Sequence, residues 1–266
     1  MTVREWVEVG RRRTFRPWVP HQHGAWVMLA LPILVGIAAS RLVPGQLLLA
    51  GVAVAAYLAS ATLQAWLRAR RRPSYVPSIA AYGAATALLG IPLLILEPRL
   101  IVAAIIVVPA GALTLAAARP GTPRELVLSL AHVAQASVLA PAAMLLAGQT
   151  STWVLGAATA IVAAEMAGSV LAVRSVIRER DNAGFAIRSV AYHAGITLAA
   201  AASLPLAYAA LGAFLTARAA ALPLARRRLA SRGRGLRPIH VGLIEAIASI
   251  ALVAVALAVP LVAARQ

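Results

Sequence analysis

The sequence predicts an all-α fold, a polytopic transmembrane helical bundle of about nine spans. The first observation is composition: 61% of the 266 residues are hydrophobic and 12% are charged, whereas an ordinary soluble domain is about 45–50% apolar and about 25% charged. The second is that the apolar residues form runs near the length of about 18 residues that a span needs. The third is that arginines separate most of these runs.

The residue types that are missing narrow the chemistry. The chain has no cysteine, and all 25 of its basic residues are arginine. A disulfide framework, an iron–sulfur cluster and a thiol nucleophile are therefore excluded, as is a Schiff-base lysine.

Charged residues, prolines and glycines mark the limits of each expected helix in order. The first lies between the basic N-terminal segment and Arg41, and the next three end before the arginines at 68–72, before Pro98 and before Arg119. The fifth ends before Gly148, the sixth before Arg174, and the eighth before the arginines at 226–228. The nine expected helices cover residues 24–40, 46–66, 76–96, 100–118, 125–147, 153–173, 189–206, 208–224 and 240–262.

The seventh and eighth helices could instead be one kinked helix, which would leave eight spans. A single helix would put the basic stretches at 174–188 and 226–237 on opposite sides of the membrane, so we expect two helices. Several of the spans are short, and tilt or local thinning of the bilayer is expected.

The arginines also predict the orientation. All but Arg41, Arg99 and Arg265 fall on one side of this arrangement. By the positive-inside rule the N-terminus is then cytoplasmic and the C-terminus outside, in a bacterial cytoplasmic (inner) membrane. The formal charge of +17 is explained by cytoplasmic loops, and we expect no nucleic-acid partner.

We expect two regions along the chain. Residues 1–20 form a basic cytoplasmic or interfacial segment whose Trp6, Phe15 and Trp18 anchor it at the membrane surface. Residues 21–263 form a single transmembrane domain. A cleaved signal peptide ending near Ser40 is the competing interpretation, and Pro32, which interrupts the apolar run, argues against it.

Small residues spaced four apart predict where helices pack closely, because they let two backbones approach. The pairs that fit are Gly51 with Ala55, Gly156 with Ala160, and Ala163 with Ala167. This pattern predicts packing and no activity.

Polar residues gather at the expected cytoplasmic ends of the helices. They are His21, Gln22, His23, Trp26, Gln64, Arg68, Arg174, Arg178, Glu179, Asp181, Asn182, Tyr192, His193 and His240. Interfacial capping and hydrogen bonding are the ordinary role of such residues. A composite metal or haem site is the alternative, in which His21 and His23 join His193 and His240 from other helices.

The sixth connection predicts an anion site. Arg174 and Arg178 lie four residues apart, on one helix face, with Glu179 and Asp181 beside them. Two such guanidinium groups could clamp a phosphate or diphosphate, while a carboxylate orients it or helps to hold a cation. A salt-bridged loop is the plain alternative. Glu165, in the middle of the sixth helix, could serve a proton-coupled transporter or simply be hydrogen-bonded within the bundle.

Three sequence elements resemble the YwiC-like family of bacterial membrane proteins. They are Pro20-His-Gln-His-Gly-Ala-Trp26, Arg174-Ser-Val-Ile-Arg-Glu-Arg180 and Tyr192-His193. The likeness extends over most of the chain, and the family implies little about mechanism.

A more distant resemblance is to the UbiA superfamily of intramembrane prenyltransferases. It rests on nine helices, a cytoplasmic N-terminus and polar loops after the second and sixth spans. It implies magnesium and an isoprenoid diphosphate held by aspartate-rich motifs in those two loops. Here the first loop, Gln64-Ala-Trp-Leu-Arg-Ala-Arg-Arg-Arg-Pro-Ser-Tyr75, has no aspartate, and the second offers Glu179 and Asp181.

These observations lead to one functional hypothesis and two alternatives. In the first, a UbiA-like bundle binds an anionic, isoprenoid or quinone-like lipid at its cytoplasmic face and modifies it as a transferase. Its candidate acid/base groups are His21, His23, His193, Glu179 and Asp181. The alternatives are a small-molecule transporter and a non-catalytic, haem- or metal-binding partner of a membrane complex.

Overall fold

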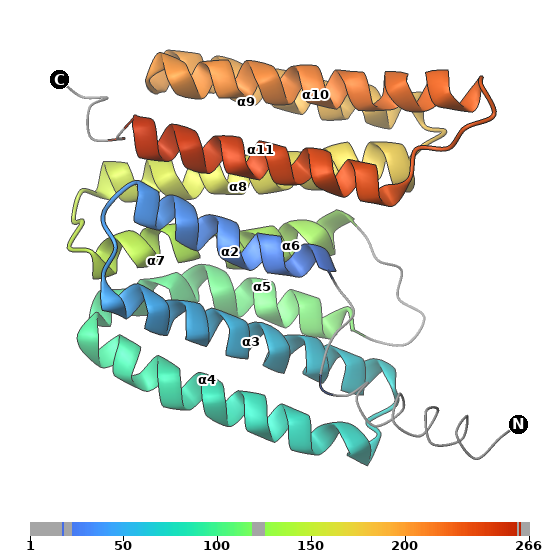
Figure 1. Cartoon of the computed structure of the whole chain (residues 1–266). Coiled ribbons are helices and arrows are strands. Elements are labelled where there is room, and N and C mark those ends of the chain that lie inside the picture. The colour runs from blue at the N-terminus through green and yellow to red at the C-terminus, as the bar shows by residue number, and fades with distance from the viewer. Residues whose placement is uncertain (1–17, 19–22, 119–125, 260, 262–266) are drawn as a thin grey trace, which may run out of the picture. The chain divides into compact units, whose positions relative to one another are not determined.

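The regular elements of the described chain are all helices. The computed structural model describes residues 18, 23–118, 126–259 and 261, without the side chains of residues 23–25. Within these ranges there is no strand. The elements are α2 (His23–Ala38), α3 (Pro44–Arg68), η1 (Pro73–Tyr75), α4 (Val76–Leu96), η2 (Pro98–Ala103), α5 (Ala104–Ala116), α6 (Leu126–Ser137), α7 (Leu139–Leu146), α8 (Thr152–Ile177), α9 (Ala183–Ser203), α10 (Leu206–Ala230) and α11 (Pro238–Ala258) (Figure 1).

Each expected helix has its counterpart in the described residues. The fifth is formed by α6 and α7, which are separated at Val138. Pro141 explains this interruption, because proline lacks the N–H that would bond the carbonyl of Ser137 and its ring crowds that carbonyl. The seventh and eighth helices are separate, and the alternative of one kinked helix is wrong. Leu204 is extended (φ −128°, ψ 163°), as the residue before a proline tends to be, so α9 ends at Ser203 and α10 follows Pro205.

Among the described residues, seven helical segments are long and apolar enough to cross a membrane. They are α3, η1 with α4, η2 with α5, α6 with α7, α8, α10 and α11. In α2, the described side chains form the apolar stretch Trp26–Ala38, which is not counted among the seven. The remaining long helix, α9, carries Arg188, Tyr192 and His193 and is not among the seven. The chain is therefore a polytopic helical membrane protein.

By its internal contacts the chain divides into two compact units. The first consists of Met1–Leu29 and Val43–Gln135, and the second of Ala30–Leu42 and Ala136–Gln266. Each unit is described by itself.

In the first unit, α3 packs along α4. The contact is close at Gly51, where an added Cβ would lie 3.2 Å from Leu89 Cδ1, which confirms the packing role expected of Gly51. Two edge-to-face aromatic pairs join separate segments, Trp18 with Tyr82 and Trp26 with Tyr57, each with ring centroids 5.9 Å apart.

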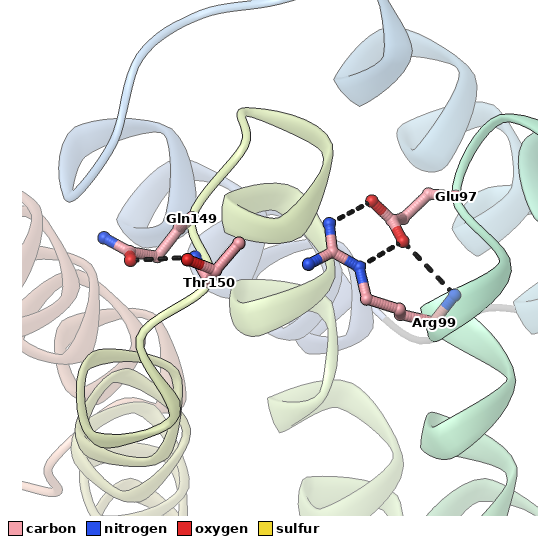
Figure 2. Close-up of polar contacts among 4 residues, drawn as sticks. All are labelled: Glu97, Arg99, Gln149 and Thr150. Atoms are coloured by element: carbon pink, nitrogen blue, oxygen red, sulfur yellow. Dashed lines mark hydrogen bonds and ion pairs between the residues drawn. The ribbon is translucent and has the colours of Figure 1, made fainter.

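The turn between α4 and η2 is fixed by an ion pair (Figure 2). Arg99 donates from Nε to Glu97 Oε1 at 2.7 Å and from Nη2 to Oε2 at 2.6 Å. The Arg99 backbone N–H also donates to Oε1, so that Glu97 caps η2. The hydrogen bonds from the Arg99 side chain hold the pKa of Glu97 below its usual range. This pair therefore stabilises the turn only while Glu97 is ionised.

Replacing Arg99 should have an effect on stability that depends on pH. Because the pKa of Glu97 is lower in the folded than in the unfolded chain, the stabilisation is present above the unfolded pKa and is lost as the pH falls through the folded one. We expect Arg99→Gln to lower the melting temperature at neutral pH and not at strongly acidic pH. The effect should be small, because Arg99 is half exposed. Thermal unfolding of both proteins at the two pH values measures this, and an equal difference at both would contradict it.

In the second unit, α8 to α11 pack against one another (Figure 1). Near the start of α8, the core includes Met144, Ala158 and Tyr208, and the Tyr208 hydroxyl donates to the Val259 carbonyl at 3.1 Å. The loop before α8 is tied by Gln149 Oε1, which accepts from the backbone N–H groups of Thr150 and Ser151 (Figure 2).

At the other end of α8 a second core joins three helices. Val176 of α8, Leu222 of α10 and Val241 of α11 are buried together. The end of α8, the end of α10 and the start of α11 therefore meet at one end of this unit. The helix midpoints lie between the two cores.

Candidate functional site: buried charges within α8–α11

Among the described residues of the second unit, four acidic, basic or histidine side chains are buried, one from each of four helices. They are Glu165 of α8, His193 of α9, Arg218 of α10 and Glu245 of α11, with exposed fractions of 5%, 4%, 6% and 9%. The first three lie near the midpoints of their helices, and Glu245 lies about two turns from the start of α11. Charges at such depth are costly in a membrane and usually serve a function.

Arg218 connects this cluster. Its Nη1 donates to Glu245 Oε2 at 2.9 Å, and its Nη2 lies 3.3 Å from His193 Nε2. An arginine is always protonated and has no acceptor atom, so His193 Nε2 must accept. The His193 proton then lies on Nδ1, which is 2.7 Å from the Ser189 carbonyl and donates to it. The bundle thus fixes His193 as a neutral imidazole of one tautomer.

Glu165 lies on α8 less than one turn before Gly168, against which His193 Nε2 packs, and so belongs to the same buried cluster. Its Oε1 is buried and has no hydrogen-bond partner, and the same holds for Glu245 Oε1 and Arg218 Nε. The Tyr192 hydroxyl donates to the Ala164 carbonyl at 3.2 Å. The cluster therefore retains unused donor and acceptor atoms in a buried place.

Gly168 gives the cluster its space. An added Cβ at this position of α8 would lie 2.7 Å from His193 Nε2, the atom that receives the hydrogen bond from Arg218. The lack of a side chain here lets His193 occupy the gap between α8 and α10.

The predicted anion site lies at the end of the unit where α8 stops and α9 starts. Arg174 Nη2 lies 3.4 Å from Glu179 Oε1, and Glu179 Oε2 accepts from Asn182 Nδ2 at 3.2 Å. Asn182 also caps α9, because its Oδ1 accepts from the Phe185 N–H at 3.0 Å. The Arg174 side chain is 18% exposed, yet its Nε and Nη1 are buried without a partner.

Arg226 of α10 closes the same end. It donates from Nη1 to the Arg180 carbonyl and from Nη2 to Asp181 Oδ1 at 3.1 Å. Asp181 also pairs with Arg180. Both acidic residues of this connection are thus engaged by cations, and the guanidinium of Arg174 has free donors. Arg178, at the C-cap of α8, is exposed and has an interaction of its own.

The other predicted site residues are distributed over both units. Gln64 is buried in the first unit and its Nε2 bonds Ser60 Oγ at 3.3 Å. Arg68 ends α3 and has an interaction partner, and Trp26 is exposed beside Tyr57. His240 is exposed in the second unit, with Nε2 3.3 Å from Arg237 Nη2. His21 and Gln22 lie outside the described residues, as does the side chain of His23.

Two placements differ from the sequence-based expectation. Tyr192 and His193 were expected one turn inside their helix, but α9 begins at Ala183, so both lie near its middle. Arg218, counted among the cytoplasmic arginines, lies in the buried centre of α10. The physical reason is an ion pair: because Arg218 pairs with Glu245 of α11, its charge can remain inside an apolar bundle.

Sequence reasoning therefore missed Arg218 and Arg226 as site residues and did not connect Glu165 with Glu245. An arginine in the middle of the expected helix 208–224 was the available signal. The described residues contain no group of three or more His, Cys, Asp or Glu side chains placed to hold a metal ion. The predicted histidine cluster needs His21 and His23, whose side chains lie outside the described residues, so it stays a prediction.

The fold and the buried charges define the class of protein: a multi-pass helical membrane protein with ionisable groups inside its bundle. Residues 19–144 match the family model of the YwiC-like proteins, which confirms the resemblance to that family for this part of the chain. The match includes the His-Gln-His-Gly-Ala-Trp26 element and ends before Arg174 and His193. The chain matches no curated protein and no solved structure.

Proposed function

We propose that this protein binds the anionic head group of an isoprenoid or quinone-like lipid in a bacterial cytoplasmic membrane. The observation that carries the proposal is Arg174, whose Nε and Nη1 are buried at the end of an apolar bundle without a partner. Two such donors suit a phosphate or diphosphate oxygen, since charge-assisted bonds from arginine are strong and directional. The lipid chain would lie along the apolar helices.

In this proposal arginine holds the anion, and no magnesium ion is needed, because the nearby carboxylates already have partners. A UbiA-like prenyltransferase would need carboxylates free for a metal, whereas Glu179 is engaged by Arg174 and Asn182, and Asp181 by Arg180 and Arg226. Transfer chemistry on the lipid is the extension of the proposal, with Glu179 and Asp181 as its acid/base candidates once the ligand displaces their partners.

The proposal predicts selective lipid binding that depends on Arg174. We expect farnesyl diphosphate to raise the melting temperature of the detergent-purified full chain, and Arg174→Gln to weaken its binding at least about tenfold, because a hydrogen bond to a charged group contributes roughly 1.5–3 kcal/mol. Arg232→Gln is the matched control. It removes the same charge from an exposed position in the connection after α10.

Phosphatidylglycerol distinguishes this site from ordinary lipid contacts. If it stabilises the chain as well as farnesyl diphosphate does, Arg174 is a general membrane anchor and the proposal fails. Equal binding by wild type and Arg174→Gln would also overturn it. A quinone analogue in place of the diphosphate tests the second lipid class.

A small-molecule transporter is the second candidate, favoured by the position of Glu165 near the midpoint of α8. Uptake into proteoliposomes that is abolished by Glu165→Ala and retained in Arg178→Ala would support transport over lipid binding. The haem- or metal-binding partner of a membrane complex is the remaining proposal. His193 contributes little to it, because both of its ring nitrogens are engaged.

A further inference from the structure

The buried cluster of α8–α11 holds an uneven number of charges. Arg218 supplies one positive charge, which the ion pair with Glu245 compensates. His193 is neutral, because it accepts from Arg218 and donates to Ser189. Glu165 is the remaining acid, so the cluster is neutral when Glu165 carries a proton and has one negative charge when it does not.

Neither state of Glu165 is locked by its surroundings. Its Oε1 has no partner, so no donor compels the ionised form. Arg218, on α10 of the same buried cluster, carries the positive charge, and its Nε donor is unused. Burial favours the neutral acid, and the neighbouring guanidinium favours the carboxylate. No hydrogen bond at Oε1 therefore fixes either the ionised or the protonated form of Glu165.

The charged and titratable groups around Glu165 can be named from every packed helix. They are Tyr192 and His193 from α9, Arg218 from α10, and Glu245 from α11. Among them Glu245 has a direct ion-pair partner at 2.9 Å, and Arg218 cannot lose its proton. Both ring nitrogens of His193 are engaged, and the Tyr192 hydroxyl donates to the Ala164 carbonyl. This leaves Glu165 as the group whose charge can change.

We propose that Glu165 is a membrane-embedded proton-exchange site, for which the Arg218–Glu245 pair is the fixed counter-charge. On release the O–H bond of the Glu165 carboxyl breaks, the electron pair remains on the carboxylate, and the proton passes to water; uptake is the reverse. His193 is a positioning residue, which orients the Arg218 guanidinium. This inference goes beyond lipid binding at Arg174 and does not depend on it.

Infrared difference spectroscopy of the full chain in liposomes tests the proposal. A change of pH should alter one carboxyl C=O stretching band from a buried acid, and Glu165→Gln should abolish that band. Glu97→Gln, which removes an acid between α4 and η2, should leave it unchanged. Glu165→Asp keeps a carboxyl group and should move the band without removing it, which covers the case in which Glu165→Gln does not fold.

Three results would overturn the proposal. One is the absence of any pH-dependent buried carboxyl band. Another is a band that persists in Glu165→Gln and disappears in Glu245→Gln, because the exchanging acid would then be Glu245. The third is a band that responds to sodium at constant pH, which would make the site a cation site. Because lipid binding at Arg174 does not enter this measurement, the two proposals can fail separately.

Discussion

Arg218→Met should destabilise the protein by about 3–5 kcal/mol, the usual effect of removing one partner of a buried ion pair. The change leaves Glu245 buried without its cation and His193 without its donor. Methionine retains much of the volume of the arginine stem, so the loss is electrostatic and not a cavity. Thermal unfolding in detergent would show it as a large fall in the melting temperature.

The double variant Arg218→Met/Glu245→Leu is the decisive control. When both partners of a buried ion pair are replaced by apolar residues of similar size, stability is often unchanged or improved. We therefore expect the double variant to recover most of the loss of Arg218→Met, with a coupling energy that a double-mutant cycle measures. A double variant as unstable as the single one would mean that the loss does not come from the unpaired charge of Glu245 and arises instead from the missing bond to His193.

The Arg218–Glu245 ion pair should matter more for proton exchange at Glu165 than for the stability of the fold. Its replacement by apolar residues should keep the fold and remove the positive charge that makes ionised Glu165 tolerable. The double variant would then be folded and unable to exchange a proton. The double variant would thus keep its stability and lose its proton exchange. This is the result expected if the buried charges are retained for function and not for stability.

The helices were predictable because hydrophobic run length and punctuation are local properties. The expected helix 76–96 coincides with α4, and 46–66 falls inside α3. The errors lie where polar residues belong to a helix. The expected start at residue 189 left six residues of α9 in the loop, because Arg188 was taken as a loop residue, although α9 begins after the cap at Asn182.

The buried site was less predictable, because it depends on which helices are neighbours. Each of Glu165, Arg218 and Glu245 could be recognised as a charge in an apolar segment, but only the packing of α8, α10 and α11 makes them partners. The close contacts expected at small residues also depend on which helices are neighbours. Gly156 was expected at a close contact, yet a Cβ there would meet nothing within 4 Å.

Gly36→Leu should be the most disruptive change at a glycine, because α2 and α7 meet there with no space between them. A Cβ on Gly36 would lie 2.5 Å from the Ala140 carbonyl oxygen and 2.8 Å from Ala143 Cβ. These are backbone and short side-chain atoms that cannot turn away, so the helices must separate. Overpacking of this kind costs about 1–3 kcal/mol and occasionally more.

Gly83→Leu on α4 is the matched control, since a Cβ there meets nothing within 4 Å. We expect Gly36→Leu to lower the melting temperature by several degrees or to prevent folding, with Gly83→Leu near wild type. Gly36→Ala should give a smaller loss of the same kind, because its methyl group alone would already clash with the Ala140 carbonyl oxygen. If Gly36→Ala and Gly83→Ala have the same melting temperature, α2 does not pack on α7 as closely as the distances at Gly36 indicate. The contact that holds residues 30–42 in the second unit would then lie elsewhere.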